Sequence, residues 1–203
     1  MPTKADYPQN AEQLYPPVVN DLKTDLVECL YTDQRLRHSD RPWVLVNMVI
    51  SIDGAHAVNG KTRGLSGPAD RSLYQILRGL ADIILVGAGT IRAERYRKPQ
   101  TPDIRISELR RQRGQSVRPR LAVVSGGLDL DPTIGMFEDQ HPLDPLPLVY
   151  TTTTADQHKR KLLGTVAEVV DLGSDIWSPS SMLTDLLERG TGIVLCEGGP
   201  TLN

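Results

Sequence analysis

The sequence predicts an α/β domain in which helices cover both faces of a mostly parallel sheet. Two observations lead to this fold class. The strand candidates are continuous apolar runs, such as WVLVNMVIS at 43–51, and strands of that kind are covered on both faces. These runs also alternate along the chain with segments of helical spacing, which is the order found in parallel α/β proteins. With 203 residues, the chain is long enough for one domain with a substantial core.

An N-terminal arm is expected at residues 1–40, ahead of the main domain at 41–203. The first part of the arm is polar and contains four prolines, which is typical of a flexible or surface-hugging segment. Apolar residues then recur at helical spacing and predict a short helix that ends near Tyr31; they are Leu22, Leu26, Val27 and Leu30. Asn20 or Asp21 can cap this helix.

Six strand candidates are expected in the main domain. Besides 43–51, one lies in the run 82–90, which passes from apolar residues into a glycine-rich turn, and the others lie at 121–125, 147–154, 166–173 and 192–201. Helices are expected between them at 70–80, 90–97, 156–163 and 179–189. The first of these is predicted from an amphipathic spacing of Leu73, Ile76, Leu77 and Leu80, and Gly190 stops the last one.

Turn residues and one basic segment separate these elements. Asp53-Gly54 supplies a turn after the first strand, and the stretch 57–68 carries the turn signals Asn59-Gly60 and Gly67-Pro68, so a loop or hairpin is expected there. Residues 95–118 are strongly basic with few apolar residues. Such a run favours a solvated helix and loop. Whether it contacts a substrate phosphate stays open.

Composition argues against several classes of function. Lys+Arg 23 against Asp+Glu 25 gives a net charge of −2, which disfavours binding to nucleic acid or an anionic membrane through bulk charge. The aromatic residues (Trp 2, Tyr 6, Phe 1) are too few for base-stacking platforms. The N-terminal residues lack the apolar core of a signal peptide, and no apolar run reaches bilayer length. We expect a soluble, cytoplasmic protein.

Several catalytic motifs are absent from the sequence. Two cysteines are too few for a disulfide framework or a Cys-based zinc site. The histidines show no metal-ligand spacing, so no metal is expected; they are His38, His56, His141 and His158. There is no G-x-S-x-G of a serine hydrolase and no Walker A loop.

Two predicted strands end in glycine-rich turns, and ligands of open α/β sheets bind beyond such carboxyl ends. Gly87-Ala88-Gly89-Thr90 follows one strand, and Glu197-Gly198-Gly199-Pro200-Thr201 follows the other. Glycines let a phosphate approach the backbone, so two such turns at one edge suit the pyrophosphate of a dinucleotide. Plain tight turns are the alternative, since Arg92 stands where the dinucleotide fingerprint has its third Gly or Ala. Pro200 also suits an ordinary helix start.

Three charged residues are candidates for chemistry at this edge. Asp53 is either a turn-former beside Gly54 or a carboxylate at the mouth of the site that binds or protonates a substrate. Glu197 closes an apolar strand and needs a partner, for which a substrate N–H is suited. Arg78 is either solvated or faces the cleft, where it would hold a phosphate through two hydrogen bonds.

Three motifs together resemble the riboflavin-biosynthesis pyrimidine reductase family, in the order and with the spacing of that family. S-x-D-G lies in VNMVISIDGAHAVNGKTRGLSGPADR, G-x-G-T in ADIILVGAGTIRAE, and E-G-G-P-T-L in IVLCEGGPTL, so the resemblance covers roughly 43–203. The family comprises the C-terminal reductase domain of the bifunctional bacterial riboflavin enzyme and its stand-alone relatives. The resemblance implies a three-layer, dihydrofolate-reductase-like fold.

The resemblance also implies a reaction. NADPH is the expected hydride donor, and the expected substrate is a phosphorylated ribosylaminopyrimidine whose ribosyl group is reduced to ribityl. A homodimer is expected as well. Members of the family continue past E-G-G-P-T-L with a helix and further strands, so we expect the chain to be truncated and to lack the C-terminal strands of the sheet. The arm at 1–40 resembles the extension of actinobacterial stand-alone members.

Site residues follow from the resemblance, position by position. Those expected to contact NADPH are Gly87, Gly89, Thr90, Gly198, Gly199, Pro200, Thr201 and Leu202, with Ser125 on the adenosine side. Those expected to bind the substrate are Asp53, Thr62, Ser66, Arg78 and Glu197. Asp53, near the nicotinamide, and Glu197 are the expected catalytic residues, because one of them or a bound water has to supply a proton to the product.

Two departures from the family pattern and one absence bear on the function. Glu94 stands where many members have Asp, and Gly64 replaces an aromatic residue common in bifunctional enzymes, which removes a stacking surface. The H-x-E and P-C-x-x-C motifs of the zinc deaminase half do not occur, so the chain has at most the reductase half. Two alternatives stay open: a dihydrofolate or pteridine-type reductase on the same fold, and a catalytically silent NADP-binding paralogue.

Overall fold

The computed structural model describes most of the chain. The described residues are 10–11, 24–32, 39–55, 57–58, 64–94, 96–100, 102–138, 144–174, 178–199 and 201–202. Thr62, Pro200 and the predicted turn at Asn59-Gly60 lie outside them. None of the described helices has both the length and the apolar composition that a membrane crossing requires.

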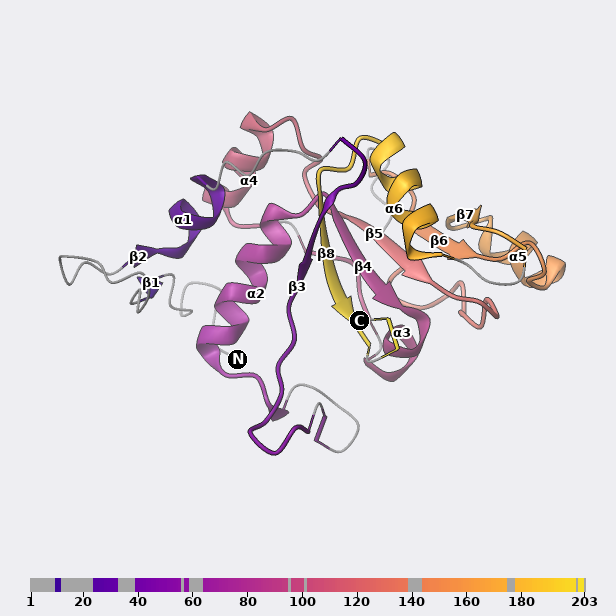
Figure 1. Cartoon of the computed structure of the whole chain (residues 1–203), viewed down its shortest axis with the longest axis horizontal. Coiled ribbons are helices and arrows are strands. Elements are labelled where there is room, and N and C mark those ends of the chain that lie inside the picture. Colours follow the sequence, from indigo (N-terminus) through magenta and orange to yellow (C-terminus); the bar gives the residue numbers. More distant parts are fainter. Residues whose placement is uncertain are drawn as a thin grey trace.

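A six-stranded, entirely parallel sheet forms the centre of the described structure (Figure 1). In spatial order its strands are β3 (Trp43–Val46), β8 (Ile193–Gly198), β4 (Ile83–Gly87), β5 (Arg120–Val124), β6 (Leu148–Thr151) and β7 (Glu168–Asp171). The last strand along the chain, β8, inserts between β3 and β4, so the carboxyl ends of β4 and β8 lie side by side. The predicted α/β fold with a mostly parallel sheet is confirmed.

Helices cover both faces of the sheet, as predicted. Successive residues of a strand point to opposite faces. Ile84 of β4 belongs to a buried cluster with α3 (Ala88–Glu94) and α5 (Gln157–Leu163), whereas its neighbour Ile83 belongs to a second cluster with α6 (Pro179–Glu188). The apolar runs of β4, β5 and β6 are continuous because both faces are buried in this way.

A third cluster lies at the β3 end of the sheet. Figure 1 shows α1 (Leu26–Thr32), α2 (Pro68–Leu80) and α4 (Ile104–Gln112) on one side of the view, with α5 and β7 on the other. Val27, Ile76 and Ile106 form the buried contacts between these three helices. A short antiparallel pair, β1 (Asn10–Ala11) with β2 (Thr24–Asp25), precedes α1 and was not predicted.

Helix boundaries follow local capping groups. Asp156 caps α5 by accepting a hydrogen bond from the Lys159 amide at 2.9 Å, and Gly190, with φ of 83°, follows the end of α6. The N-terminal helix begins at Leu26, later than predicted, because Asp25 caps it through the Glu28 amide at 3.0 Å. Asn20 and Asp21, the residues predicted to cap this helix, lie outside the described residues.

The first strand of the sheet is shorter and more exposed than predicted. β3 ends at Val46, although the apolar run continues to 51. Its only neighbour in the described sheet, β8, pairs with four residues of it, from Trp43 to Val46. Val46 and Met48 are 59% and 45% exposed, and α6 packs against the central strands rather than against β3. Burial of this strand on both faces is thus a wrong prediction.

The basic segment 95–118 contains one side chain that is not solvated. Arg110 of α4 is fully buried and donates hydrogen bonds to the carbonyl oxygens of Gly79 and Ala81, each at 2.7 Å, and of Ser116 at 2.8 Å. The last carbonyls of α2 have no partner within their own helix, and this guanidinium satisfies them. Burial lowers the pKa of Arg110. The solvated interpretation of the segment is wrong for this residue.

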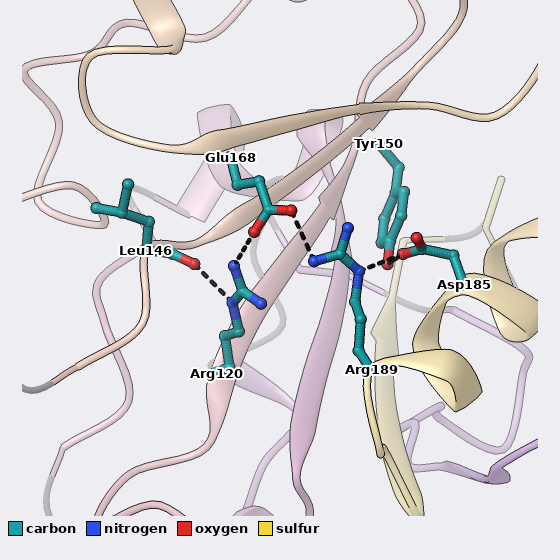
Figure 2. A network of polar contacts seen from close by, with 6 residues as sticks. All are labelled: Arg120, Leu146, Tyr150, Glu168, Asp185 and Arg189. Carbon is teal, nitrogen blue, oxygen red and sulfur yellow. Dashed lines mark hydrogen bonds and ion pairs between the residues drawn. The ribbon is translucent and has the colours of Figure 1, made fainter.

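A chain of ion pairs ties three strands to α6 (Figure 2). Glu168 at the start of β7 accepts from Arg120 of β5 and from Arg189, each at 2.6 Å. Arg189 also pairs with Asp185 of α6 at 2.6 Å, and the Tyr150 hydroxyl of β6 donates to that same carboxylate at 2.6 Å. The network contains two arginines and two carboxylates, so it has no net charge. It links β5, β6 and β7 to α6.

Candidate active site

A cleft of about 1350 Å³ opens at the carboxyl edge of the sheet. It is larger than most single-ligand pockets, which measure roughly 300–1,000 Å³. Residues of α2, of the turn between β4 and α3, of the loop after β5 and of the end of β8 line it. Several predicted site residues therefore meet in one space; they are Ser66, Arg78, Gly87, Gly89, Thr90, Ser125, Glu197, Gly199, Thr201 and Leu202.

The two glycine-rich turns pack directly on each other. Val86 of β4 pairs with Gly198 of β8, and the Thr90 hydroxyl donates to the Gly198 carbonyl at 3.3 Å. Gly199 has φ of 99°, in the left-handed region, and a Cβ there would lie 2.7 Å from Thr90 Oγ1. Both conformation and space therefore require glycine at this position. The predicted meeting of the two turns at one edge is confirmed.

The part of the cleft that the two glycine turns border is suited to a dinucleotide. A Cβ built on Gly89 or on Gly126 would have no atom within 4 Å, so the backbone is open to a close ligand after both β4 and β5. Ser125, which precedes Gly126 at the end of β5, is buried and lines the cleft. On the other side, Thr201 and Leu202 line it, and the Leu202 amide donates to the Gly199 carbonyl at 2.9 Å. A pyrophosphate bound there would meet backbone from three strand ends.

A buried polar cluster forms the floor of the cleft beside the glycine turns. Arg78 of α2 donates from Nε to Glu197 Oε1 at 2.6 Å and from Nη2 to Glu197 Oε2 at 2.7 Å. The Tyr74 hydroxyl donates to Glu197 Oε2 at 2.7 Å, and the Tyr96 hydroxyl donates to the same oxygen. Tyr96 in turn accepts from Arg78 Nη2 at 2.6 Å. The Arg78 guanidinium also stacks over Tyr74, 4.3 Å from the ring centre.

Burial and charge fix the protonation states of Tyr74, Tyr96 and Arg78. The side chains of Arg78 and Glu197 are only 16% and 5% exposed. Burial, reinforced by the Glu197 carboxylate, raises the pKa of Tyr74 and of Tyr96 well above the usual range, so both phenols stay protonated. Burial acts to lower the pKa of Arg78, but its hydrogen bond to Glu197 outweighs this and raises it. The cluster is thus an ion pair held by two neutral donors.

Comparison with known proteins assigns the chain to a family. The model of the RibD C-terminal domain family matches residues 42–203. The chain belongs to this family. RibD C-terminal domains are NADPH-dependent reductases, and their fold is the dihydrofolate-reductase-like α/β fold described above.

Three relatives show the extent of the similarity. A 2,5-diamino-6-ribosylamino-4(3H)-pyrimidinone 5′-phosphate reductase of Archaeoglobus fulgidus is 29% identical over 80% of this chain and 72% of its own. A crystal structure of a pyrimidine reductase-like protein from Corynebacterium diphtheriae matches with a TM-score of 0.73 and 27% identity, over 87% of this chain and 73% of that one. A deaminase/reductase of Thermotoga maritima shares the fold, with a TM-score of 0.58 and 22% identity over 80% of this chain and 40% of its own.

Asp53 is not among the predicted site residues that line the cleft of this RibD C-terminal domain. It sits in a tight turn in which the Gly54 amide donates to the Ser51 carbonyl at 2.9 Å and Gly54 has φ of 84°. Its exposed carboxylate accepts from the Ser51 hydroxyl, which, with backbone amides, lowers the pKa of Asp53. The structure does not place Asp53 in the lining of the cleft. The turn-forming interpretation describes this geometry, and the catalytic role of Asp53 stays a prediction.

Tyr74 and Tyr96 are site residues that were not predicted from the sequence. Tyr74 precedes Arg78 by one helical turn on α2, a spacing that places both on one face and was available as a signal. Tyr96 follows α3 in a segment without periodicity, and no pattern pointed to it. The partner that Glu197 was expected to need is provided by Arg78 and these two tyrosines. Contacts of Glu197 and Arg78 with a substrate stay predictions.

Proposed function

We propose that this protein reduces the ribosyl group of a ribosylaminopyrimidine 5′-phosphate to ribityl, with NADPH as the reductant. One observation carries the proposal: the open glycine turns of β4 and β8 and the Arg78–Glu197 cluster share a single cleft, large enough for a dinucleotide and a second ligand. The relative from Archaeoglobus fulgidus, whose name states this substrate class, supports the choice of pyrimidine.

The cleft has a cofactor side and a substrate side. Gly87, Gly89, Thr90 and Gly199 border the end of β4, and Ser125 borders the end of β5, so these residues are suited to hold the pyrophosphate and adenosine of NADPH. When bound there, NADPH supplies a hydride for C1′ of the opened sugar. The wall formed by α2, with Ser66, Tyr74 and Arg78, is left for the substrate.

The reduction consumes one proton in addition to the hydride. Asp53 does not line the cleft, whereas Glu197 and its hydroxyl partners form part of its floor. A water bound beside Glu197 and Tyr74 is therefore better placed than Asp53 to pass a proton to the product. Tyr74 and Tyr96 would hold the Glu197 carboxylate in place while substrate and cofactor bind above it.

Assembly, location and domain organisation are part of the proposal. We propose that the protein acts as a homodimer in the cytoplasm, that residues 41–203 are its reductase domain and that 1–40 form an arm. The match of the family model to 42–203 supports the domain boundary, and family resemblance supports the dimer. Light scattering on the purified protein tests the dimer, and a monomer at working concentration would contradict it.

An assay of NADPH consumption tests the proposed reaction. The protein is mixed with NADPH and the ribosylamino 5′-phosphate of either a diaminopyrimidinone or an aminouracil, and the product is identified by mass spectrometry. Oxidation of NADPH with formation of a ribityl product supports the proposal. Dihydrofolate serves as the competing substrate: if kcat/KM for dihydrofolate exceeds that for both pyrimidines, the pteridine-type alternative is correct. Tight NADPH binding without turnover of any of them would identify a catalytically silent paralogue.

A further inference from the structure

Helix α2 has one face in the cleft and another face packed against apolar residues. Tyr74 and Arg78 line the cleft. Ile76 and Leu80 are buried in the cluster at the β3 end of the sheet. Two residues along an α-helix turn the direction of the side chain by about 200°, so these two pairs point to opposite sides of α2. The element that packs against Ile76 and Leu80 therefore determines how far α2 lies from the strand that carries Glu197.

Helix α1 packs against this apolar face, although it precedes the part of the chain that the family model matches. The match begins at residue 42, whereas α1 spans Leu26–Thr32. Val27 and Tyr31 are buried in the same cluster as Ile76, together with Ile106 of α4. Figure 1 shows α2 between α1 and the strands β3 and β8, and α2 contacts both α1 and β8. No described residue of α1 lines the cleft, so its influence on the site is indirect.

The contact between α1 and α2 reaches the backbone next to Arg78. Gly79 follows Arg78 in the sequence and brings the helix backbone close to its neighbours. A Cβ at this position would overlap Cγ2 of Ile106 and lie 3.3 Å from the hydroxyl oxygen of Tyr31. Tyr31 and Ile106 therefore pack on the backbone of α2 with no intervening side chain, and a displacement of α1 would be passed directly to Arg78.

Two arginines of the basic segment hold α1 in place. Arg105 of α4 pairs at 2.6 Å with Asp25, the residue that caps α1. Arg113, directly after α4, donates from Nη2 to the carbonyl oxygen of Tyr31, and its guanidinium lies over that ring, 4.6 Å from the centre. Tyr31 is therefore restrained at both its ring and its backbone. Its buried hydroxyl has no hydrogen-bond partner among the described residues, so the ring makes the contacts that matter.

The pair of Arg78 with Glu197 tolerates little movement of α2. Its two N–O distances are 2.6 and 2.7 Å, and a hydrogen bond weakens steeply once the separation exceeds about 3.2 Å. A displacement of Arg78 by roughly 1 Å would take both contacts out of hydrogen-bonding range. The support of α2 from behind is thus a condition for the geometry of the cleft floor.

From these contacts we propose that α1 belongs functionally to the reductase site, with Val27 and Tyr31 as positioning residues that hold Arg78 in place through α2. This role rests on the proposed function, and it adds to the site an element outside the family-matched part of the chain. Arg105 and Arg113 then act on the site by restraining α1, at a distance from the substrate.

Kinetics and cofactor binding of Tyr31→Ala test the proposal. We expect the KM for the ribosylaminopyrimidine 5′-phosphate to rise about 10- to 100-fold, the range for a binding geometry displaced by about 1 Å. The Kd for NADPH, measured by calorimetry, should stay unchanged, because the glycine turns belong to β4 and β8 and α1 does not line the cleft. Tyr31→Phe keeps the ring against α2 and Arg113, so its KM should stay close to that of the wild type.

A matched variant separates positioning from general loss of stability. Leu186 of α6 is fully buried in the cluster on another part of the sheet, so Leu186→Ala should lower the unfolding midpoint and leave KM unchanged. Val27→Ala removes a smaller part of the α1 contact and should raise KM in the same direction, which keeps the test open if Tyr31→Ala does not fold. An equal rise of KM in Leu186→Ala, or a wild-type KM in both α1 variants, would overturn the proposal.

Nuclear magnetic resonance of the arginine side chains, without any substrate, separates this role from the proposed function. The buried Nε–H of Arg78 is bonded to Glu197 and should give a slowly exchanging signal, which Arg78→Lys identifies by its loss. The signal should broaden or disappear in Tyr31→Ala and persist in Tyr31→Phe and Leu186→Ala. If it depends on Tyr31 in this way but no pyrimidine is reduced, the proposed reaction is wrong and the positioning role stands. If pyrimidines are reduced and Tyr31→Ala changes neither the signal nor KM, the reaction stands and the positioning role is wrong.

Discussion

Arg78 and Glu197 are 119 positions apart in the chain and form a two-pronged ion pair, with Nε–Oε1 at 2.6 Å and Nη2–Oε2 at 2.7 Å. The fold brings them together because β8 inserts between β3 and β4, which places its carboxyl end beneath α2. Two tyrosine hydroxyls complete the shell around the carboxylate. This pair joins the cofactor turn at Gly198 to the helix that forms the substrate wall.

Removing the charge of Glu197 should destabilise the fold. Glu197→Gln leaves Arg78 buried without its counterion, and breaking a buried pair in this way costs about 3–5 kcal/mol. Urea unfolding measures the loss. Glu108→Gln is the matched control, because Glu108 forms an exposed pair with Arg111 and its substitution should leave the free energy of unfolding nearly unchanged. Equal stability of the two variants would show that the buried pair contributes no more than the exposed one.

Glycine at position 199 should be required for cofactor binding. Gly199→Ala forces a residue with a side chain into φ of 99° and brings its Cβ 2.7 Å from Thr90 Oγ1, so either the Thr90 side chain or the two turns must move. We expect the Kd for NADPH, measured by calorimetry, to rise at least about 10-fold, equivalent to roughly 1.4 kcal/mol. Gly190→Ala is the control. Gly190 has φ of 83° but lies at the end of α6, outside the cleft lining, so its substitution should lower stability and leave the Kd unchanged. An unchanged Kd in Gly199→Ala would contradict the assigned cofactor turn.

Arg110 should contribute to stability without affecting the site. Arg110→Met removes the donors to the carbonyls of Gly79, Ala81 and Ser116 and leaves buried acceptors unsatisfied, which costs about 1–3 kcal/mol for each group left unpaired. Thermal unfolding should show a clearly lower midpoint, while NADPH affinity of the folded protein stays the same. Arg111→Met, on the exposed side of α4, should leave the midpoint nearly unchanged. A wild-type midpoint in Arg110→Met would rule out this role.

The ion-pair chain of Figure 2 should make stability depend on acid pH. Burial acts to raise the pKa of Glu168, but hydrogen bonds from Arg120 and Arg189 outweigh it and lower the pKa below its ordinary value of 4.5. Glu168 therefore contributes stability that is fully present above about pH 4.5 and is lost as the pH falls through its lower value in the folded state. Urea unfolding from neutral pH to pH 3 should show a steeper decline for the wild type than for Glu168→Gln. Parallel declines would show that this carboxylate is not stabilised by folding.

The sheet was predictable from sequence because its signal is local. Runs such as Ile83–Val86 are apolar at every position, which is typical of a strand buried on both faces. The same rule failed at β3, where the run extends beyond the residues that pair with β8. The length of an apolar run does not predict how many of its residues will pair with the neighbouring strand.

The site was only partly predictable, because its decisive contacts are long-range. The glycine turns can be recognised from their own residues. Because each follows a strand of a parallel sheet, their meeting at one edge could be predicted. The pairing of Glu197 with Arg78, and the hydroxyl of Tyr96 that bridges them, depend on how α2 and the segment after α3 pack over β8. Arg110 shows the same limit, since its partners are carbonyls of a different helix that no residue type reveals.

Transfer of a labelled hydride is the most direct test of the proposed reaction. The protein is incubated with the ribosylaminopyrimidine 5′-phosphate and NADPH that carries deuterium at C4 of the nicotinamide, prepared separately with each stereochemistry. We expect one of the two preparations to yield a ribityl product with a single deuterium at C1′, and the other to yield the unlabelled product. NADPH that remains unoxidised, or deuterium that never reaches C1′, would contradict it.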